Sequence, residues 1–284
     1  MIVLPLLARE GKPAMNRILV WDIPTRVFHW LLTGTSIVAL SIALGVDDDS
    51  SVFQLHMLFG LIAAFAVILR LLWGIVGSRY ARFGSFLFGP KALFGYLHAA
   101  LRGRSERHVG HNPGSAYAIY AMLLLTIGLG ASGLLMPSGE AFEELHEIMA
   151  YLMISVIVVH IIGLVWHTIR QRENIALSMI DGRKAGEPSQ AIRSSHLLAG
   201  VAFLALCAAW AFAIFSGYDA QAGQLRLPVL GQTIRLGEHR GEGASHRERE
   251  REDHEDWEHR EKRRSDRNHR DTREHYEDHE EDDD

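Results

Sequence analysis

The stretch HEIMAYLMISVIVVH, residues 146–160, is an apolar run with a histidine at each end, and the following IIGLVWH adds His167. Ionisable side chains in segments long enough to cross a membrane are rare and usually face a functional interior. Fourteen residues of α-helix return to within about 40° of the same direction and advance about 21 Å, and seven residues return to within about 20°. His146, His160 and His167 are therefore predicted to share one helix face at three depths.

The same chain contains four other apolar segments of about 20 residues, the length that spans about 30 Å of hydrocarbon. A water-soluble helix needs a polar face, and the third and fifth of the five segments contain no charged residue at all. The sequence therefore predicts an all-α integral membrane protein with five transmembrane helices. The five segments are residues 27–46, 54–76, 114–136, 145–169 and 195–216.

The connections between these segments differ sharply in positive charge. Lys and Arg occur before the first segment, between the second and third, and between the fourth and fifth. The remaining loops, DDDSS and PSGEAFEE, contain neither residue. By the positive-inside rule, the N-terminus is predicted to be cytoplasmic, and five spans then place the C-terminal tail in the periplasm.

Composition excludes several classes of protein. Cys207 is the single cysteine, which excludes intramolecular disulfides and the CxxC and CxxCH motifs of zinc, iron–sulfur and covalently attached haem sites. No basic stripe indicates a nucleic acid partner. Residues 1–16 include an apolar patch too short for a signal-peptide core, and Met15 is a more natural start, so we interpret them as an N-terminal extension.

Four histidines form two level-matched pairs. His29 lies near the cytoplasmic start of the first helix, roughly level with His160, and His56 lies near the outer start of the second, level with His146. Two facing neutral imidazoles satisfy the axial positions of an iron without a thiol, so the pattern predicts two bis-histidine b-type haems. A di-zinc site is disfavoured because most of the membrane separates the pairs and no carboxylate lies near His160.

Some assignments stay open at this point. By depth, His29 is level with a position between His160 and His167, and His167, beside Trp166 at the aqueous edge, could instead be an anchor. Arg70 in the second helix would bind a haem propionate if buried, or snorkel to the lipid headgroups if not.

Further positions near these ligands also have two interpretations. Gly60, one turn after His56, leaves room either for a flat macrocycle or for close helix packing. Trp30, Trp73 and Trp166 are expected to be interfacial anchors.

Four motifs in order, VWDIPTRVFHWLL, HMLFGLIAAFAVILRLLWGIVGSRYARF, GHNPGSA and HEIMAYLMISVIVVHIIGLVWH, resemble the prokaryotic cytochrome b561 and nickel-hydrogenase-type cytochrome b family. The resemblance covers about residues 17–185 and implies a four-helix membrane bundle with two b-type haems. The family's histidines match His29, His56, His146 and His160, which favours His160 over His167. The pairing by depth is His29 with His160 on the cytoplasmic side and His56 with His146 on the outer side.

The remainder of the chain exceeds this family core. We expect a domain of residues 17–185, a fifth transmembrane helix over 192–217 opened by an interfacial His196, and a disordered tail over 237–284. The tail is rich in Asp, Glu, Arg and His; it could be a solvated polyampholyte, bind divalent metals weakly, or dock a positively charged cytochrome. Its histidines are His239, His246, His254, His259, His269, His275 and His279.

Together these features predict a bacterial inner-membrane cytochrome that transfers electrons between quinone and a partner redox protein. The resemblance implies a hydrogenase, a periplasmic c-type cytochrome or a dehydrogenase as partner. Whether the chain is a quinol-oxidising subunit or a carrier is open. The alternative, a divalent-metal transporter or metal-binding membrane protein that uses the tail, predicts carboxylates near midmembrane, and the first four spans have none.

Overall fold

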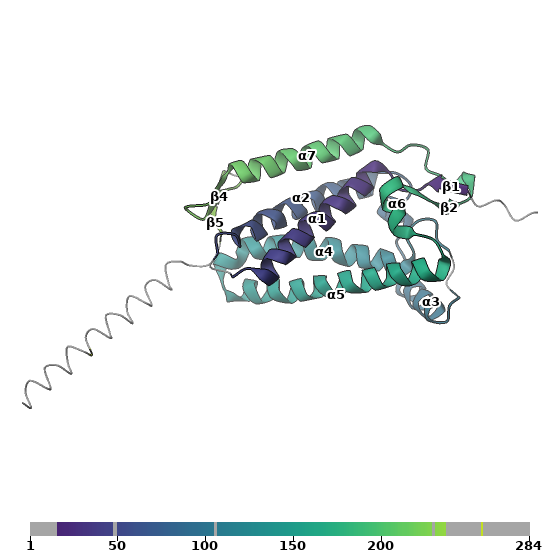
Figure 1. Ribbon diagram of the computed structural model, residues 1–284, viewed down its shortest axis with the longest axis horizontal. Coiled ribbons are helices and arrows are strands. Elements are labelled where there is room, and N and C mark those ends of the chain that lie inside the picture. Colours follow the sequence, from purple (N-terminus) through teal and green to yellow (C-terminus); the bar gives the residue numbers. More distant parts are fainter. Residues whose placement is uncertain (1–15, 48–49, 105–106, 229–230, 237–256, 258–284) are drawn as a thin grey trace, which may run out of the picture. The chain divides into compact units, whose positions relative to one another are not determined.

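The computed structural model describes residues 16–47, 50–104, 107–228, 231–236 and 257 (Figure 1). Five of its helices are long and apolar enough to cross a membrane, which confirms the predicted multi-pass, mostly helical fold. They are α1 (Ile23–Gly45), α2 (Gln54–Val76), α4 (Pro113–Leu135), α5 (Glu140–Gln171) and α7 (Leu197–Ser216).

Helices α1 and α5 are longer than the apolar runs that predicted them. Helix α1 begins at Ile23, four residues before its apolar run, because Asp22 caps it and Pro24 occupies its first turn. Helix α5 has 32 residues and extends beyond its apolar run at both ends. Its first turn contains Glu140 and Glu143, whose charges favour a helix N-terminus.

The helices pack in chain order, α1 on α2, α2 on α4, and α4 on α5, while α7 packs on α1 and α2. Neither α1 nor α2 packs its backbone extensively against α5. Glycines on α4 allow close approach to its neighbours: a Cβ on Gly128 would lie 2.6 Å from Sδ of Met149 on α5, and one on Gly130 would lie 3.1 Å from Cβ of Ala64 on α2.

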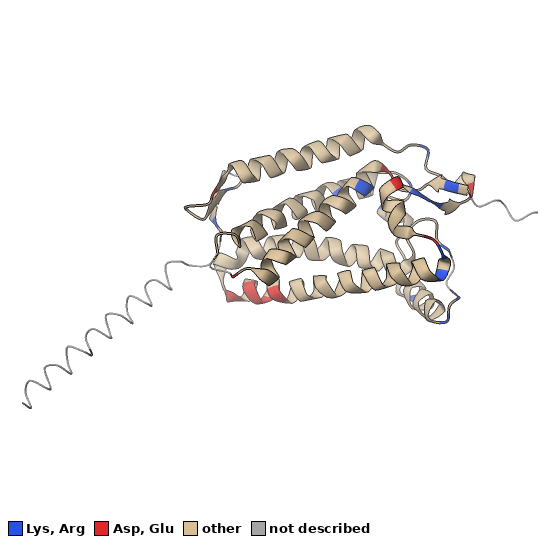
Figure 2. Ribbon diagram, in the orientation of Figure 1, with Lys and Arg blue, Asp and Glu red and all other residues tan. Residues whose placement is uncertain are grey.

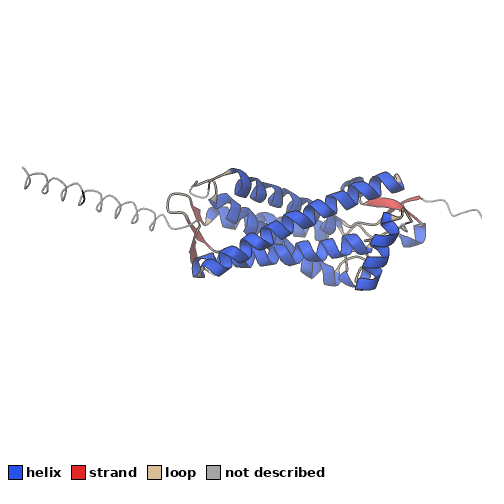
Figure 3. Ribbon diagram, turned by 90° about the horizontal axis from the view of Figure 1, so that it is seen from below, coloured by secondary structure: helices blue, strands red, loops and turns tan. Residues whose placement is uncertain are grey.

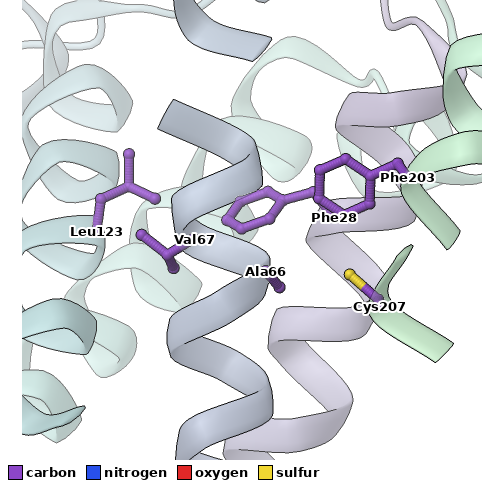
Figure 4. Packing of buried hydrophobic residues seen from close by; sticks show 6 residues of the cluster. All are labelled: Phe28, Ala66, Val67, Leu123, Phe203 and Cys207. Atoms are coloured by element: carbon purple, nitrogen blue, oxygen red, sulfur yellow. The ribbon is translucent and has the colours of Figure 1, made fainter. Parts of the chain in front are cut away.

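A hydrophobic cluster joins α1, α2, α4 and α7 (Figure 4). The rings of Phe28 on α1 and Phe203 on α7 meet edge to face with centroids 6.3 Å apart, a favourable aromatic arrangement. Helix α7 is therefore part of the packed core. The buried members of the cluster are Phe28, Ala66, Val67, Leu123, Phe203 and Cys207.

A two-stranded ladder closes one end of the helices. Strand β1 (Asn16–Leu19) pairs antiparallel with β2 (Arg183–Gly186), which follows the short helix α6 (Ile175–Asp181). Gly182 ends α6 at φ 78°, a left-handed conformation that favours glycine, and its carbonyl accepts hydrogen bonds from the amides of Val20 and Trp21. We call this the β1–β2 end.

Short helices complete the β1–β2 end. Helix α3 (Pro90–Leu101) packs on α4. Arg170, near the end of α5, donates a hydrogen bond of 3.0 Å to the carbonyl of Gly103, just after α3. The sequence analysis did not predict α3, α6 or the ladder. The short helices are η1 (Phe83–Ser85), α3 (Pro90–Leu101) and η3 (Pro188–Gln190), while η2 (Met136–Ser138) links α4 to α5.

A three-stranded antiparallel sheet follows α7 and closes the opposite end, here the β3–β5 end (Figure 3). Its strands are β3 (Tyr218–Asp219), β4 (Gln224–Arg226) and β5 (Thr233–Arg235). Leu225 packs against Leu58 of α2 and Ile214 of α7, and the Tyr218 hydroxyl donates to Oε1 of Gln54 at 2.6 Å. No strand was predicted for this stretch, whose alternating apolar residues cover the ends of two helices.

Asp22 ties α1 to α2 at the β1–β2 end. It is fully buried, and its carboxylate accepts hydrogen bonds from the Thr25 amide (2.9 Å) and from Nε1 of Trp73 (3.0 Å). Trp73 therefore also links α2 to α1 through this hydrogen bond, a contact that its predicted role as an interfacial anchor did not include. Trp30 and Trp166 are about half exposed, at 49% and 50%.

Residues 1–15 and the predicted tail, apart from Trp257, lie outside the described residues. The chain divides into two compact units between Leu236 and Gly237.

We predict that Asp22→Ala lowers the free energy of unfolding by roughly 2 kcal/mol, because it removes a helix cap and leaves a buried indole N–H unpaired. Asp22→Asn keeps an acceptor for the cap and should lose less. Thermal unfolding of the protein in detergent measures the difference, with the exposed Asp47→Ala as control. An Asp22→Ala protein as stable as the wild type would contradict the prediction.

Candidate functional site

His56 on α2 and His146 on α5 face each other at the β3–β5 end. Their ring centroids are 6.1 Å apart and their planes are inclined at 74°. Two imidazoles bound to one metal ion through bonds of about 2.0 Å place their centroids about 6 Å apart, so this separation fits a shared iron. The structure thus brings together the pair that the sequence predicted for the outer side.

The hydrogen bonds of His56 and His146 indicate which ring nitrogen carries the proton and which keeps a lone pair that could bind a metal. Nδ1 of His56 lies 2.9 Å from the carbonyl oxygen of Ala39, which can only accept, so Nδ1 carries the proton. Nδ1 of His146 lies 3.0 Å from Oγ of Ser132, which itself donates to the Leu129 carbonyl at 3.3 Å and so accepts from His146. Both Nε2 atoms keep a lone pair, the form in which neutral histidine ligates a metal.

Gly60 lies one turn beyond His56 on α2. A Cβ placed on this glycine would meet no atom within 4 Å, so the residue is not needed for close helix packing. The packing interpretation of Gly60 is therefore wrong. The open space beside His56 is what a flat macrocycle requires.

His29 on α1 and His160 on α5 form the second pair, near the β1–β2 end. They lie close enough for their charges to interact. Nδ1 of His29 is buried without a hydrogen-bond partner, and the His29 ring lies edge to face against Trp30 with centroids 5.1 Å apart. His29 belongs to α1 and His160 to α5, so the interacting charges come from two different helices.

His167 does not behave as a surface anchor. It is 7% exposed, and its electrostatic neighbours are charged groups of the β1–β2 end, first among them Lys184 and Glu173. The exposed Trp166 beside it points elsewhere. The anchor interpretation of His167 is therefore wrong, and the histidine whose charge acts on His29 is His160.

Arg70 on α2 is 2% exposed, so it does not snorkel to a headgroup region. Its Nη2 donates to the Ala81 carbonyl at 2.9 Å, its guanidinium lies 5.0 Å from the Phe83 ring centroid, and its Nη1 is buried without a partner. In the part of the chain that the structure describes, the one ion pair within 4 Å joins Arg17 to Asp181. The buried carboxylate of Asp22 lies near enough to act on the charge of Arg70, but Nη1 still lacks a hydrogen-bond partner and fits an additional anion.

His111 is a buried polar group that the sequence analysis quoted within GHNPGSA but gave no role. Its ring lies between Trp21 and Phe86, at centroid distances of 4.6 and 4.5 Å, and its Nε2 is buried without a partner. The sequence feature that could have drawn attention to His111 is its place directly before Asn112, the residue that caps α4.

Within residues 16–236, leaving aside the undescribed gaps, no three His, Cys, Asp or Glu side chains gather in a way that could hold a metal ion. A haem iron takes only two axial ligands from the protein, and each of the two predicted histidine pairs would supply two. The donor set, the open space at Gly60 and the unpartnered Nη1 of Arg70 all fit bound haem.

Comparison with known proteins identifies similar cytochromes. A family model described as prokaryotic cytochrome b561 matches residues 20–182, a range that contains both histidine pairs, Arg70 and His111 and excludes α7. A probable Ni/Fe-hydrogenase B-type cytochrome subunit from Rhizobium leguminosarum bv. viciae is 24% identical over 223 residues, covering 62% of this chain and 92% of the relative. A protein of the same description from Bradyrhizobium diazoefficiens is 23% identical over 221 residues, covering 62% and 90%. No solved structure matches the chain.

Burial lowers the pKa of His111 to about 3, and the charges of Arg70, Lys184 and His160 act in the same direction. Below the ordinary pKa of 6.5, the unfolded chain therefore binds a proton at His111 that the native protein does not bind. We predict that the free energy of unfolding falls as pH drops from 6.5 toward 3, by up to about 1.4 kcal/mol per pH unit from this group.

Thermal unfolding at pH 7 and pH 5 tests this prediction. His111→Leu should lose less stability between the two pH values than the wild type, whereas exposed His98→Leu should match the wild type. Equal losses in His111→Leu and wild type would show that His111 is not the group responsible.

Proposed function

Because the chain belongs to the prokaryotic cytochrome b561 family, we propose that it is a di-haem b-type cytochrome that transfers electrons between the quinone pool and a partner redox protein. The observation that carries the proposal is the facing pair His56 and His146, 6.1 Å apart with both Nδ1 atoms engaged. The second pair, fourteen residues further along α5, supports a second haem.

In this proposal His56 and His146 hold one haem, and His29 and His160 hold the other. Bound haem supplies the one-electron redox chemistry, and the protein supplies orientation and electrostatics. The Ala39 carbonyl and the Ser132 hydroxyl hold the proton on Nδ1 of their histidines, which orients the rings and raises the basicity of Nε2. Arg70 brings a positive charge near the second pair and is proposed to pair with a haem propionate.

The four helices α1, α2, α4 and α5 are proposed to form the haem-binding bundle, with α7 as a fifth span on its outside. About 21 Å of helix rise separates His146 from His160, which distributes the two ligands across most of the hydrocarbon. Electrons would thus cross from one surface of the membrane toward the other.

The charge distribution supports an orientation (Figure 2). Lys and Arg gather at the β1–β2 end, whereas Glu140, Glu143, Glu144 and Glu147 lie at the start of α5 toward the opposite end. We propose that the β1–β2 end faces the cytoplasm and that the β3–β5 end and the tail face the periplasm of a bacterial inner membrane.

The names of the relatives support an order in which partners should be tested. Two of them are named as probable Ni/Fe-hydrogenase cytochrome subunits, so a hydrogenase is the first partner to test, ahead of a periplasmic c-type cytochrome or a dehydrogenase. Nothing among the described residues favours the alternative of a metal transporter.

We predict that membranes containing the protein give a reduced-minus-oxidised spectrum with b-type bands. His29→Ala and His56→Ala should each lose about half of the haem, because each removes an axial ligand from one site. His167→Ala and the exposed His98→Ala should retain both haems. A colourless protein that retains zinc would overturn the haem proposal, and loss in His167→Ala of the haem that His29 binds would move the assignment away from His160.

Ser132 offers a second test, because removing a partner that orients a metal-bound histidine typically weakens binding about 10–100-fold. We predict a loss of this size in haem affinity at the His56–His146 site of Ser132→Ala, measured by titrating haem into the protein prepared without it. Ser155→Ala is the control, since Ser155 is exposed on α5 and bonds only to the Tyr151 carbonyl. Equal affinity in Ser132→Ala and wild type would contradict the role given to Ser132.

A further inference from the structure

Buried side-chain polar atoms without a partner are concentrated at one end of the described chain. All of them belong to residues at the β1–β2 end, either in the nearer part of α1 and α2 or in the loops that follow α2 and precede α4. Since buried polar groups in native proteins are nearly always hydrogen bonded, such a concentration indicates a bound polar group there. The atoms are Thr25 Oγ1, Arg26 Nε, His29 Nδ1, Arg70 Nη1, Ser78 Oγ and His111 Nε2.

His111 is held in place by packing and by its own loop. Trp21 and Phe86 lie on either side of its ring. The buried ammonium of Lys184 donates to the carbonyls of His108 (2.9 Å) and Gly110 (3.4 Å), which fixes the residues just before His111. The ring thus has a defined position although its Nε2 bonds to nothing in the protein.

The same aromatic cluster connects His111 to Arg70. Phe86 contacts His111 and lies 5.8 Å from Phe83, and Phe83 lies under the Arg70 guanidinium. Gly74 allows this arrangement, because a Cβ there would collide with the Phe83 ring. Arg70 and His160 are both near enough to His111 to act on its charge. Nη1 of Arg70 and Nε2 of His111, both without a hydrogen-bond partner, therefore lie around one aromatic cluster at this end.

We propose that Nε2–H of His111 and Nη1 of Arg70 together bind one carboxylate of the haem held by His29 and His160. This inference rests on the proposed function. A b-type haem carries two carboxylate side chains, and one carboxylate has enough lone pairs to accept from both donors. Arg70 supplies the compensating charge, and His111, which stays neutral over the physiological range, supplies a directional hydrogen bond without adding a second charge.

Potentiometric titration of the two haems tests the proposal. The haem bound by His29 is identified as the one lost in His29→Ala. In His111→Leu, a carboxylate without its donor holds more negative charge near the iron, which favours the oxidised state. We expect the reduction equilibrium constant of this haem to fall up to about tenfold, or about 59 mV for one electron. The other haem should be unchanged.

Matched variants separate the hydrogen bond from the shape of the side chain. His111→Gln keeps an N–H donor and should remain close to the wild type, Arg70→Gln should lower the same potential, and His98→Leu should have no effect. Loss of this haem in His111→Leu with retention in His111→Gln would also support the donor role.

Other outcomes would overturn the inference. The inference is overturned if the potential is unchanged in His111→Leu, or if it shifts equally in His111→Leu and His111→Gln. It is also overturned if both variants lose the haem. None of these outcomes affects the haem assignment. Failure of the proposed function is distinguishable, because the wild type would then contain no haem to titrate.

Discussion

An imidazole in an apolar helix has two ring nitrogens, and each needs a partner that aliphatic neighbours do not offer. At the β3–β5 end, the protein itself satisfies Nδ1 of His56 and of His146, and only the facing Nε2 atoms remain. At the β1–β2 end, His29 and His111 keep buried nitrogens without partners. The two histidines at the β3–β5 end thus lack partners only at Nε2, while buried nitrogens of His29 and His111 at the β1–β2 end are left for a polar ligand such as the proposed one.

Helices α1 and α2 carry one histidine of each pair and are held in place by contacts away from α5. Neither α1 nor α2 packs extensively against that helix, although both present histidines to it. The stability of the arrangement comes from elsewhere, from α4 packed between α2 and α5 and from the core that joins α1, α2 and α7. The proposed ligands therefore lie between helices that other contacts hold in place, as a preorganised site requires.

The apolar spans and the shared face of the α5 histidines could be predicted because length and period are local properties of the sequence. The ladder could not, since Asn16 pairs with Gly186 and no periodicity connects residues so far apart. The environments of His111, Trp73 and Arg70 depend likewise on side chains from other elements. Hydropathy placed Arg70 correctly in α2 but could not show that Ala81 and Phe83 hold it inward.

The β1–β2 ladder has a topological consequence. By pairing residues just before α1 with residues just after α6, it brings the two ends of the family-matched region together and makes that region a nearly closed circuit. Helix α7 follows strand β2 in the sequence and therefore lies outside the region whose two ends the ladder joins. A helix added after the β1–β2 ladder, as α7 is, leaves the path of the earlier helices unchanged. Such a helix needs only a surface that packs on α1 and α2.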